Sequence, residues 1–460
     1  MDRRTFLKAV SSFAVLLPWA GQKAFAQNQQ LYRGPFLICI HANGGWDTTL
    51  FFDPKAPFNG TPVNRAYREE VKEKSDIPSW GPFRYAPVRF EETIHGNLIE
   101  VHSPERFLKE HGGDLLLLNG VDVESNAHPV GTQKVWSGHT ATDYPSVGAL
   151  LAAKASQNPN LDLPCAYLVN YGGYVQTLGL VPITQVNHPG ILKNISNPER
   201  IAGAGSNFFS AQTSQRIRQA HATRVQRLNQ QFSLPESTGA LGRYNEAMLA
   251  RNGLEPLVAK LDETPRITFD NEMLRPEARH DNGTTVANPG NINGVLQQAE
   301  LALLGFSTGT MVSASISMGD FDSHSNNDNR QRAQLSYLFV LIEYILKKAR
   351  ALALPNLFVV VGSDFARDYR YNEDNYGKEH WGVSSFMLFG PGIRGNRVIG
   401  ATKDNLYPEY VNPQNPAQLS SKESGILLQP AHVHHALRRV LGLSEFNANF
   451  GLLGEDIALF

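Results

Sequence analysis

The chain has 460 residues, 42% of them hydrophobic, and its 42 basic and 43 acidic residues give a formal net charge of −1. That length suits a large buried core, either in one α/β domain with an insertion or in two domains. A near-neutral chain without a basic stripe is not expected to bind nucleic acid.

The N-terminal residues have the features of an export signal. Arg3-Arg4 opens a twin-arginine pattern, an apolar stretch covers residues 9–21, and an A-x-A cleavage site ends at Ala26. We therefore expect a twin-arginine signal peptide over residues 1–26, export by the twin-arginine machinery, and a periplasmic or secreted mature protein. The apolar stretch is too short to span a bilayer, so no transmembrane anchor is expected after processing.

Six apolar runs along the rest of the chain predict strands. Most of them are continuous rather than alternating, which is typical of a parallel sheet that is covered on both faces. The runs cover residues 35–40, 115–118, 166–169, 310–317, 357–361 and 385–389. Cys39 lies inside the first run and is expected to be a buried thiol, and one disulfide with Cys165 is left open.

The strongest helix signal runs from Gln331 to Leu352, where apolar residues recur at helical spacing. It joins two of the predicted strands and so predicts a βαβ crossover. Between about 200 and 300, helical stretches at 211–232 and 241–262 precede an irregular segment rich in Asn, Gly, Pro and Thr. We interpret this block as an insertion or cap beside the crevice of a single domain over residues 27–460.

Acidic and histidine clusters follow three of the predicted strands. In a parallel sheet, the loops at the carboxyl ends of the strands meet at one crevice. Carboxylates and imidazoles gathered there bind divalent metals, here zinc, manganese or calcium. The candidate metal ligands are Asp47 after the first run, Asp320, Asp322 and His324 after the run at 310–317, and Asp364 and His380 after the run at 357–361.

The second cluster offers two alternative ligand pairs on one loop. His324 pairs with either Asp320 or Asp322, and His380 is the natural third ligand, which leaves a position open for water or substrate. The competing interpretation is a turn in which the Asp side chains cap backbone amides and His324 lies at the surface.

The first and third clusters offer ligands for a second metal. Asp47 follows Gly44-Gly45, and glycines there permit a close approach of the backbone, although the pair is equally common in plain turns. Asp47 and Asp364 together would hold this second ion.

Further polar residues surround the expected crevice. Arg367 could clamp an anionic group, or could pair with a surface carboxylate such as Asp368 or Asp374. Several polar residues follow the strand at 115–118, and some of them are expected to reach the crevice: Ser125, Asn126, His128, Thr132 and Ser137. His432, His434 and His435 lie on a predicted helix at a spacing that does not place ligands on one face, so we do not expect them to bind metal.

Several motifs, in this order along the chain, resemble the alkaline phosphatase and sulfatase superfamily. More narrowly, they resemble a bacterial family within it, often exported by the twin-arginine route, whose function is not established. The motif residues are Gly44-Gly45-Trp46-Asp47, Ala127-His128, Asp322-Ser323-His324, Ser363-Asp364-Phe365-Ala366-Arg367 and Glu379-His380-Trp381-Gly382. The resemblance implies an α/β/α sandwich with its site at the carboxyl ends of the strands. The spacing in the wider superfamily points to Asp320 as the ligand, and that in the narrow family to Asp322.

Two positions depart from the family pattern. Ala127 stands where the family tends to carry Ser, the usual position of the nucleophile, so covalent catalysis from this position is impossible. Phe365 stands where an Asp-His pair would supply a nitrogen ligand to the first metal site. The other metal site of the superfamily, formed by Asp320 or Asp322 with His324 and His380, is complete. Neither cysteine lies in the motif of sulfatases with an oxidised nucleophile.

These observations lead us to expect an exported, metal-dependent hydrolase that acts on a phosphate- or sulfate-type ester or a modified glycan. His128 or His41 would be the acid/base partner, and Arg367 would hold the anionic small molecule or glycan. Ser125, Thr132 or Ser137 would replace the missing nucleophile. The alternative is a catalytically inactive member that binds a glycan or a partner protein in the periplasm.

Overall fold

A computed structural model describes the chain from residue 30 to residue 460. The described part excludes residues 89, 95–96, 102, 171–172, 187–188, 197–206, 232–240, 242–252, 266, 268–291 and 374. The predicted signal peptide lies outside the described residues. Among the described helices, none is both long enough and apolar enough to cross a membrane.

An eight-stranded sheet forms the centre of the molecule, in the order β14-β6-β13-β10-β1-β9-β7-β8. Every neighbouring pair is parallel except the two that involve β13, which runs antiparallel to β10 and to β6. The strands are β1 (Phe36–Ala42), β6 (Leu116–Asp122), β7 (Tyr167–Val169), β8 (Ile183–Gln185), β9 (Ser313–Met318), β10 (Leu357–Ser363), β13 (Val383–Phe389) and β14 (Arg397–Ile399). All six predicted strands are confirmed, and β8 and β14 are short strands that the sequence analysis did not anticipate.

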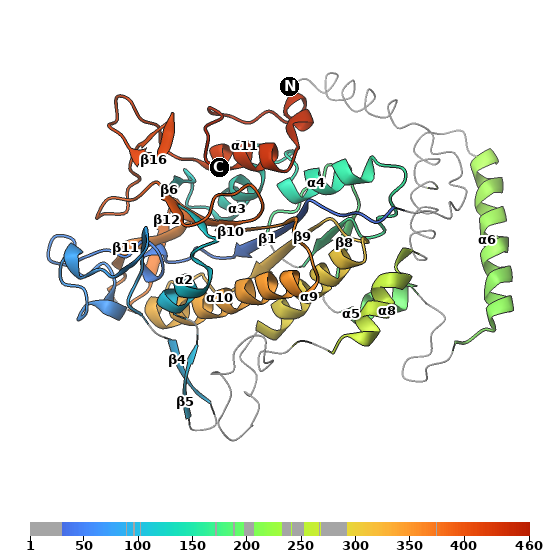
Figure 1. Ribbon diagram of the computed structural model, residues 1–460, viewed down its shortest axis with the longest axis horizontal. Coiled ribbons are helices and arrows are strands. Elements are labelled where there is room, and N and C mark those ends of the chain that lie inside the picture. The colour runs from blue at the N-terminus through green and yellow to red at the C-terminus, as the bar shows by residue number, and fades with distance from the viewer. Residues whose placement is uncertain are drawn as a thin grey trace.

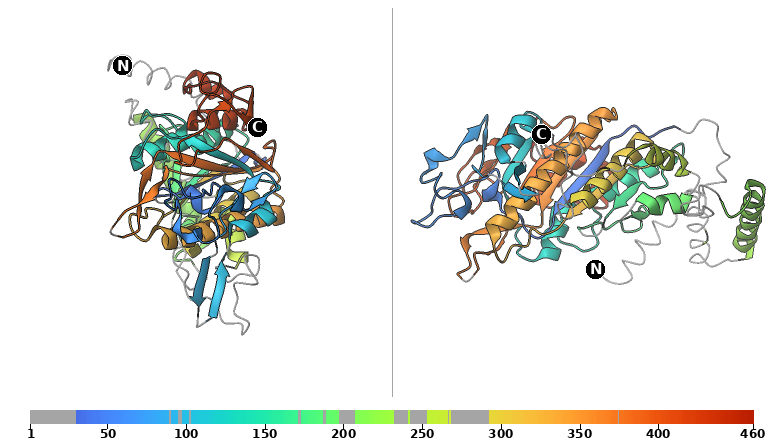
Figure 2. Two further views of the ribbon diagram at one scale, coloured as in Figure 1. Left: turned by 90° about the vertical axis from the view of Figure 1, so that its left-hand side faces the viewer. Right: turned by 90° about the horizontal axis from the view of Figure 1, so that it is seen from below.

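Helices cover both faces of this sheet (Figures 1 and 2). One face carries α3 (His128–Ser137), α4 (Val147–Ser156) and α11 (Pro430–Val440), and the other carries α2 (Pro104–His111), α9 (Ile292–Ser307) and α10 (Asn327–Ala351). The predicted three-layer α/β/α sandwich with a largely parallel sheet is therefore confirmed.

The alternation of side chains along β1 explains why its apolar run is continuous. Phe36, Ile38 and Ile40 belong to the core beneath α9 and α10, whereas Leu37 and Cys39 belong to the core beneath α3, α4 and α11. A strand with helices on both faces needs apolar residues at every position. Cys39 and Cys165 are both buried as free thiols, so the disulfide left open by the sequence does not form.

Helix α10 begins at Asn327, four residues before the predicted start at Gln331, and joins β9 to β10 along the chain. In the sheet, β1 lies between these two strands and is parallel to both. Its buried residues Leu338, Leu341 and Ile345 recur at helical spacing and pack into the core. The crossover sends the carboxyl ends of β9, β1 and β10 to the same edge of the sheet.

The segment between about 200 and 300 is described only in part. It contains α6 (Ala211–Gln231) and α8 (Glu255–Glu263), and α5 (Pro189–Ser196) precedes it. Figure 1 shows α6 at one end of the molecule and the hairpin strands β11 and β12 at the other. The described part of the predicted cap therefore does not cover the carboxyl edge of the sheet.

Short antiparallel hairpins complete the fold. They are β2 (Ser79–Trp80) with β3 (Phe83–Arg84), β4 (Phe90–Ile94) with β5 (Asn97–Val101), β11 (Ala366–Tyr371) with β12 (Lys378–Trp381), and β15 (Val411–Asn412) with β16 (Asn415–Leu419). The hairpin of β11 and β12 follows β10 directly and pairs Arg367 with His380, so it places two of the predicted site residues side by side.

Candidate metal centre

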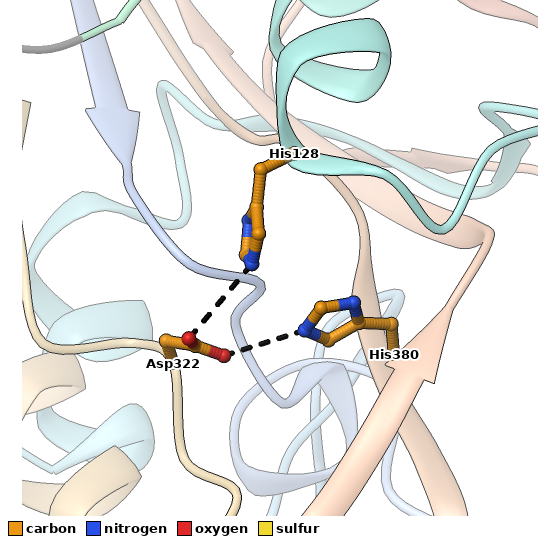
Figure 3. Close-up of side chains that lie close together, drawn as sticks. All are labelled: His128, Asp322 and His380. Carbon is orange, nitrogen blue, oxygen red and sulfur yellow. Dashed lines mark hydrogen bonds and ion pairs between the residues drawn. The ribbon is translucent and has the colours of Figure 1, made fainter.

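Three imidazoles and one carboxylate meet at the carboxyl edge of the sheet. Asp322 and His324 lie on the loop after β9, His128 begins α3 after β6, and His380 lies on β12. Figure 3 shows the rings of His128 and His380 pointing at Asp322 from different elements. The loop after β1 packs against them, because a Cβ on Gly44 would lie 2.4 Å from the backbone nitrogen of Asp322. The close approach of the backbone that the Gly44-Gly45 pair predicted therefore occurs.

The inner atoms of Asp322, His324 and His380 lie at ligand spacing. Asp322 Oδ1 is 3.1 Å from His324 Nε2 and 3.3 Å from His380 Nε2, and the two Nε2 atoms are 3.0 Å apart. Donors that share a tetrahedral metal at ~2.1 Å lie about 3.4 Å from one another. His128 Nε2 is 3.8 Å from the other oxygen of Asp322, and His128, Asp322 and His380 could also hold an ion together.

The outer nitrogens of these histidines are held by hydrogen-bond acceptors. His380 Nδ1 donates to the carbonyl oxygen of Asn126 at 2.9 Å, and His324 Nδ1 lies 3.2 Å from a carboxylate oxygen of Glu379. In a neutral imidazole the proton then sits on Nδ1, so both Nε2 atoms present lone pairs. Two lone pairs at 3.0 Å beside a carboxylate oxygen repel unless a cation or a proton lies among them.

The donor set fits a divalent metal. Fixing the outer nitrogen of a histidine with an acceptor is the usual arrangement around a protein metal ion. Two imidazoles and one carboxylate suit zinc or manganese better than calcium, which prefers oxygen ligands. Asp322 and His324 remain 47% and 42% exposed at their side chains, so the cluster is open to solvent as catalytic sites are, rather than closed like structural zinc sites.

His128 is oriented by a buried carboxylate. Its Nδ1 makes a short hydrogen bond to Asp364, whose side chain is fully buried. This hydrogen bond is the main reason why the pKa of His128 is raised, against the opposing effect of burial. Burial alone would raise the pKa of Asp364, but the hydrogen bond from His128 and the nearby imidazoles lower it overall. Asp364 thus supports His128 and does not line the cluster itself.

Arg367 has a structural position that differs from the prediction. Its guanidinium is fully buried, where Nε donates to the carbonyl oxygen of Gly45 at 2.9 Å and Nη1 to that of Lys378 at 3.0 Å. Nη2 donates to Asp322 at 2.6 Å and also to Gly44. Burial would raise the pKa of Asp322, yet the hydrogen bond from Arg367 lowers it overall. Because its three nitrogens are engaged by the protein, Arg367 does not clamp an anionic substrate and instead fixes the Asp322 carboxylate.

Asp47 does not join the cluster. Its carboxylate pairs with Lys378 Nζ at 2.8 Å, and both side chains are fully buried. It also accepts hydrogen bonds from Thr49 and from the Asn327 side chain. The lysine ammonium therefore lies where the predicted second metal would bind Asp47, and the geometry does not support a metal shared by Asp47 and Asp364.

Asp320 and His41 are also placed differently from the expectation. Asp320 is exposed, has a φ of 69°, and makes no contact with the histidines of the cluster, so the structure favours Asp322 over Asp320. His41 is 3% exposed, and its Nδ1 accepts a hydrogen bond from Trp136 at 3.0 Å. Burial lowers the pKa of His41 to about 4. A substrate cannot reach this ring, which corrects the prediction of an acid/base role.

The hydroxyl groups proposed as substitute nucleophiles are occupied or distant. Ser125 Oγ accepts the backbone N–H of Ala127, and the buried Ser137 donates to the carbonyl of Gln133 at the far end of α3. Thr132 lies in the second turn of α3, and its side chain makes no hydrogen bond to the residues of the cluster. Phe365 contacts the rings of His128 and His380, with centroids 4.7 and 4.3 Å away, and supplies an apolar wall where a nitrogen ligand was missing.

Sequence reasoning assigned no role to Lys378 and Glu379, although both directly precede His380. Asn126 was expected near the crevice, but it acts through its backbone carbonyl, a role that leaves no signal in the sequence.

The fold and the cluster define an α/β/α protein with a candidate metal centre at the carboxyl edge of a largely parallel sheet. A family model described as "Protein of unknown function (DUF1501)" matches residues 36–438, and the chain belongs to that family. No curated protein matches the sequence.

Similar solved structures include sulfatases and alkaline phosphatases. The alkaline phosphatase from the Antarctic bacterium TAB5 shares 10% identity over 90% of this chain and 99% of that chain, with a TM-score of 0.31. A putative sulfatase from Bacteroides fragilis shares 10% identity over 94% and 81%, with a TM-score of 0.36. The lipoteichoic acid synthase LtaP from Listeria monocytogenes shares 9% identity over 82% and 72%, with a TM-score of 0.31. These are the kinds of enzyme that the motifs resemble, but scores this low carry no argument about function, which rests on the site.

Proposed function

We propose that the protein is an exported, metal-dependent hydrolase of a phosphate- or sulfate-type ester or of a modified glycan, with Asp322, His324 and His380 as the metal ligands. The observation that carries the proposal is the pair of Nε2 atoms 3.0 Å apart, each on a histidine whose other nitrogen is held by an acceptor. A bound metal would polarise the ester and lower the pKa of a water molecule.

The chain's own residues would then perform the proton transfers. His128 faces the second oxygen of Asp322, its ring lies 4.5 Å from that of His380, and its orientation is set by Asp364. The raised pKa of His128 favours its protonated form, so His128 would be the group that donates a proton to the leaving oxygen. The partial exposure of His128 lets a substrate reach it.

Metal content of the protein purified without chelators or added metal tests the proposal. We expect about one equivalent of zinc or manganese by elemental mass spectrometry, lost in Asp322→Ala and His380→Ala. Asp320→Ala is the matched control, because it removes a neighbouring exposed carboxylate from the same loop and should keep the metal. Absence of metal even after reconstitution would refute the hydrolase, as would equal metal loss in Asp320→Ala and Asp322→Ala.

A second candidate function is favoured by two observations. Ala127 offers no hydroxyl, and Arg367, which could have held an anionic group, is occupied within the protein. A catalytically inactive protein that binds a glycan or another protein would show these losses. In that case a panel of phosphate and sulfate esters would show no metal-dependent turnover above the His380→Ala background, although the metal is bound.

Export is the remaining part of the proposal, and it rests on the N-terminal motif. Replacing Arg3-Arg4 by Lys-Lys should retain the protein in the cytoplasm, whereas the unchanged chain should appear in the periplasm or medium without residues 1–26.

A further inference from the structure

A polar cavity lies between three segments of the chain: residues 54–56, residues 74–84 and residues 402–409. It has a volume of about 300 Å³, and most of its lining is polar. None of the residues of the candidate metal centre lines it; its charged lining residues are Lys55, Lys74, Arg84, Lys403, Asp404 and Glu409. Cavities that hold small ligands measure roughly 300–1,000 Å³, so this one suits a single small unit rather than a chain of them.

A buried ion pair joins two walls of the cavity. Lys55 Nζ lies 2.7 Å from Asp53 Oδ1 and donates to the carbonyl oxygen of Thr402 at 2.9 Å. The hydroxyl of Thr402 in turn donates to the other carboxylate oxygen of Asp53. Because the side chains of Lys55 and Asp53 are only 8% and 9% exposed, their charges neutralise each other and the base of the cavity is formed before any ligand binds.

Two cations of the lining have no carboxylate partner among the described residues. Lys74 pairs with Asp404 at 2.8 Å, whereas Arg84 and Lys403 form no ion pair there. Arg84 Nη2 donates to the carbonyl oxygen of Lys74 at 2.9 Å, which holds the guanidinium at the cavity and leaves its other N–H groups for a ligand. Glu409 also has no ion-pair partner in the described part of the chain, so one carboxylate faces the same space.

The charges around the cavity leave an excess of one positive charge. The four cations are Lys55, Lys74, Arg84 and Lys403, and the three carboxylates are Asp53, Asp404 and Glu409.

This balance and the polar lining define the class of ligand. A monoanion neutralises the excess charge, and guanidinium and ammonium groups form their strongest hydrogen bonds with a carboxylate. An ionised carboxylate such as Glu409 accepts hydrogen bonds and donates none, so it suits the hydroxyl groups of a ligand. A ligand with one carboxylate and several hydroxyl groups meets both requirements.

We propose that this cavity binds a uronic acid unit, with Arg84 and Lys403 on the carboxylate of the sugar and Glu409 on its hydroxyl groups. No residue of the metal centre lines the cavity, so the site holds the acidic sugar without cleaving it. The site does not depend on the hydrolase activity proposed above.

Isothermal titration calorimetry of the mature protein with sodium glucuronate tests this site. Glucose and sodium phosphate are the comparison ligands, all at equal ionic strength. We expect saturable binding of glucuronate and none of glucose, because glucose lacks the carboxylate. Arg84→Gln and Lys403→Gln should each lower the affinity for glucuronate at least about 10-fold, as expected when a hydrogen bond to a charged group is lost. Both side chains are exposed, so we expect both variants to fold.

Two control variants separate this site from its surroundings and from the metal centre. Lys72→Gln removes an exposed lysine that lies close to Lys74 in the chain but does not line the cavity, and it should keep the affinity. His380→Ala removes a proposed metal ligand and should also keep it.

Four results would overturn the inference. They are the absence of glucuronate binding, binding that survives unchanged in Arg84→Gln, loss of binding in His380→Ala, and tighter binding of inorganic phosphate than of glucuronate. The third result would assign the sugar to the metal centre, and the fourth would show a site for small inorganic anions instead.

Discussion

The buried pair of Asp47 and Lys378 allows a quantitative prediction about how the metal centre is held. Lys378 Nζ donates to Asp47 Oδ2 at 2.8 Å and to the carbonyl of Val63 at 3.0 Å, and its ammonium lies 4.9 Å from the centre of the Tyr371 ring. The backbone of Lys378 also binds the site, because its N–H donates to Ser323, between Asp322 and His324. Loss of the ammonium is therefore expected to lower the stability of the fold and to disturb the loop that carries the ligands Asp322 and His324.

Lys378→Met keeps the length of the side chain and removes its charge. Breaking a fully buried ion pair from one side costs about 3–5 kcal/mol, since the remaining charge is left uncompensated. Asp47 keeps hydrogen bonds from Thr49 and Asn327 after the change, so we expect the lower end, about 3 kcal/mol. The metal affinity should fall about 10-fold, as is typical when a group that supports a ligand is lost.

Urea unfolding of Lys378→Met, Asp47→Asn and the double variant measures the coupling between the two side chains. The double variant should cost clearly less than the sum of the single variants, because no buried charge remains unpaired. A competition assay with a chromophoric chelator then gives the metal affinity of the folded proteins. A cost below about 1 kcal/mol for Lys378→Met, or additive single costs, would refute the reasoning.

Three further predictions concern other parts of the molecule. His434 has its pKa lowered by burial to about 3, so below pH 6.5 the unfolded chain binds a proton that the native state does not. Stability should therefore fall by about 2 kcal/mol between pH 7 and pH 5 in urea unfolding, and His434→Phe should remove this part of the pH dependence. Asp364→Asn should lower the pKa of His128 in the metal-free protein, measured by NMR titration of the ring, because the hydrogen bond from Asp364 is the main cause of its raised value. Gly44→Ala should cost about 2 kcal/mol or more and reduce metal binding, since its φ is +117° and its Cβ would meet the ligand loop. Gly60→Ala, where φ is +75° and no atom lies nearby, should cost about 1 kcal/mol and leave the metal in place.

The central sheet was predictable because its signal is local. Runs such as residues 357–361 are apolar at every position, and each of the six runs forms a strand. The direction of β13 was not predictable, because a short connection through the β11 and β12 hairpin returns the chain antiparallel to β10. Nothing in the apolar run at 385–389 distinguishes that arrangement from a parallel strand.

The candidate site was predictable in its ligand types but not in its partners. The loop after β9 and the histidine after β10 were identified correctly as neighbours, since both follow parallel strands. The partner of Asp47 is Lys378, 331 residues away along the chain, and no local sequence pattern predicts such a pair. The choice between Asp320 and Asp322 likewise depended on the turn, in which the positive φ of Asp320 leaves its side chain in solvent.

The residues around the opening determine the route that hydrolysis would follow. Ala127 carries no hydroxyl, Ser137 is buried and donates to Gln133, and Ser125 caps the backbone N–H of Ala127, so we expect none of these positions to provide a nucleophile. His128 is the histidine at the opening that is not assigned to the metal. We therefore expect a single displacement, in which a water oxygen bonds to phosphorus or sulfur as the bond to the ester oxygen breaks. The ester oxygen leaves with a proton from His128, and the proton released by the attacking water restores His128.

A single displacement inverts the configuration at the attacked atom, whereas two successive displacements through a covalent intermediate retain it. For a phosphate ester with a chiral, isotopically labelled phosphorus, hydrolysis by this protein should give inversion, and added alcohols should not accept the phosphoryl group. Retention, or transfer to an added alcohol, would show that a side chain forms a covalent intermediate after all. The assignment of Ala127 as the residue that closes the covalent route would then be wrong.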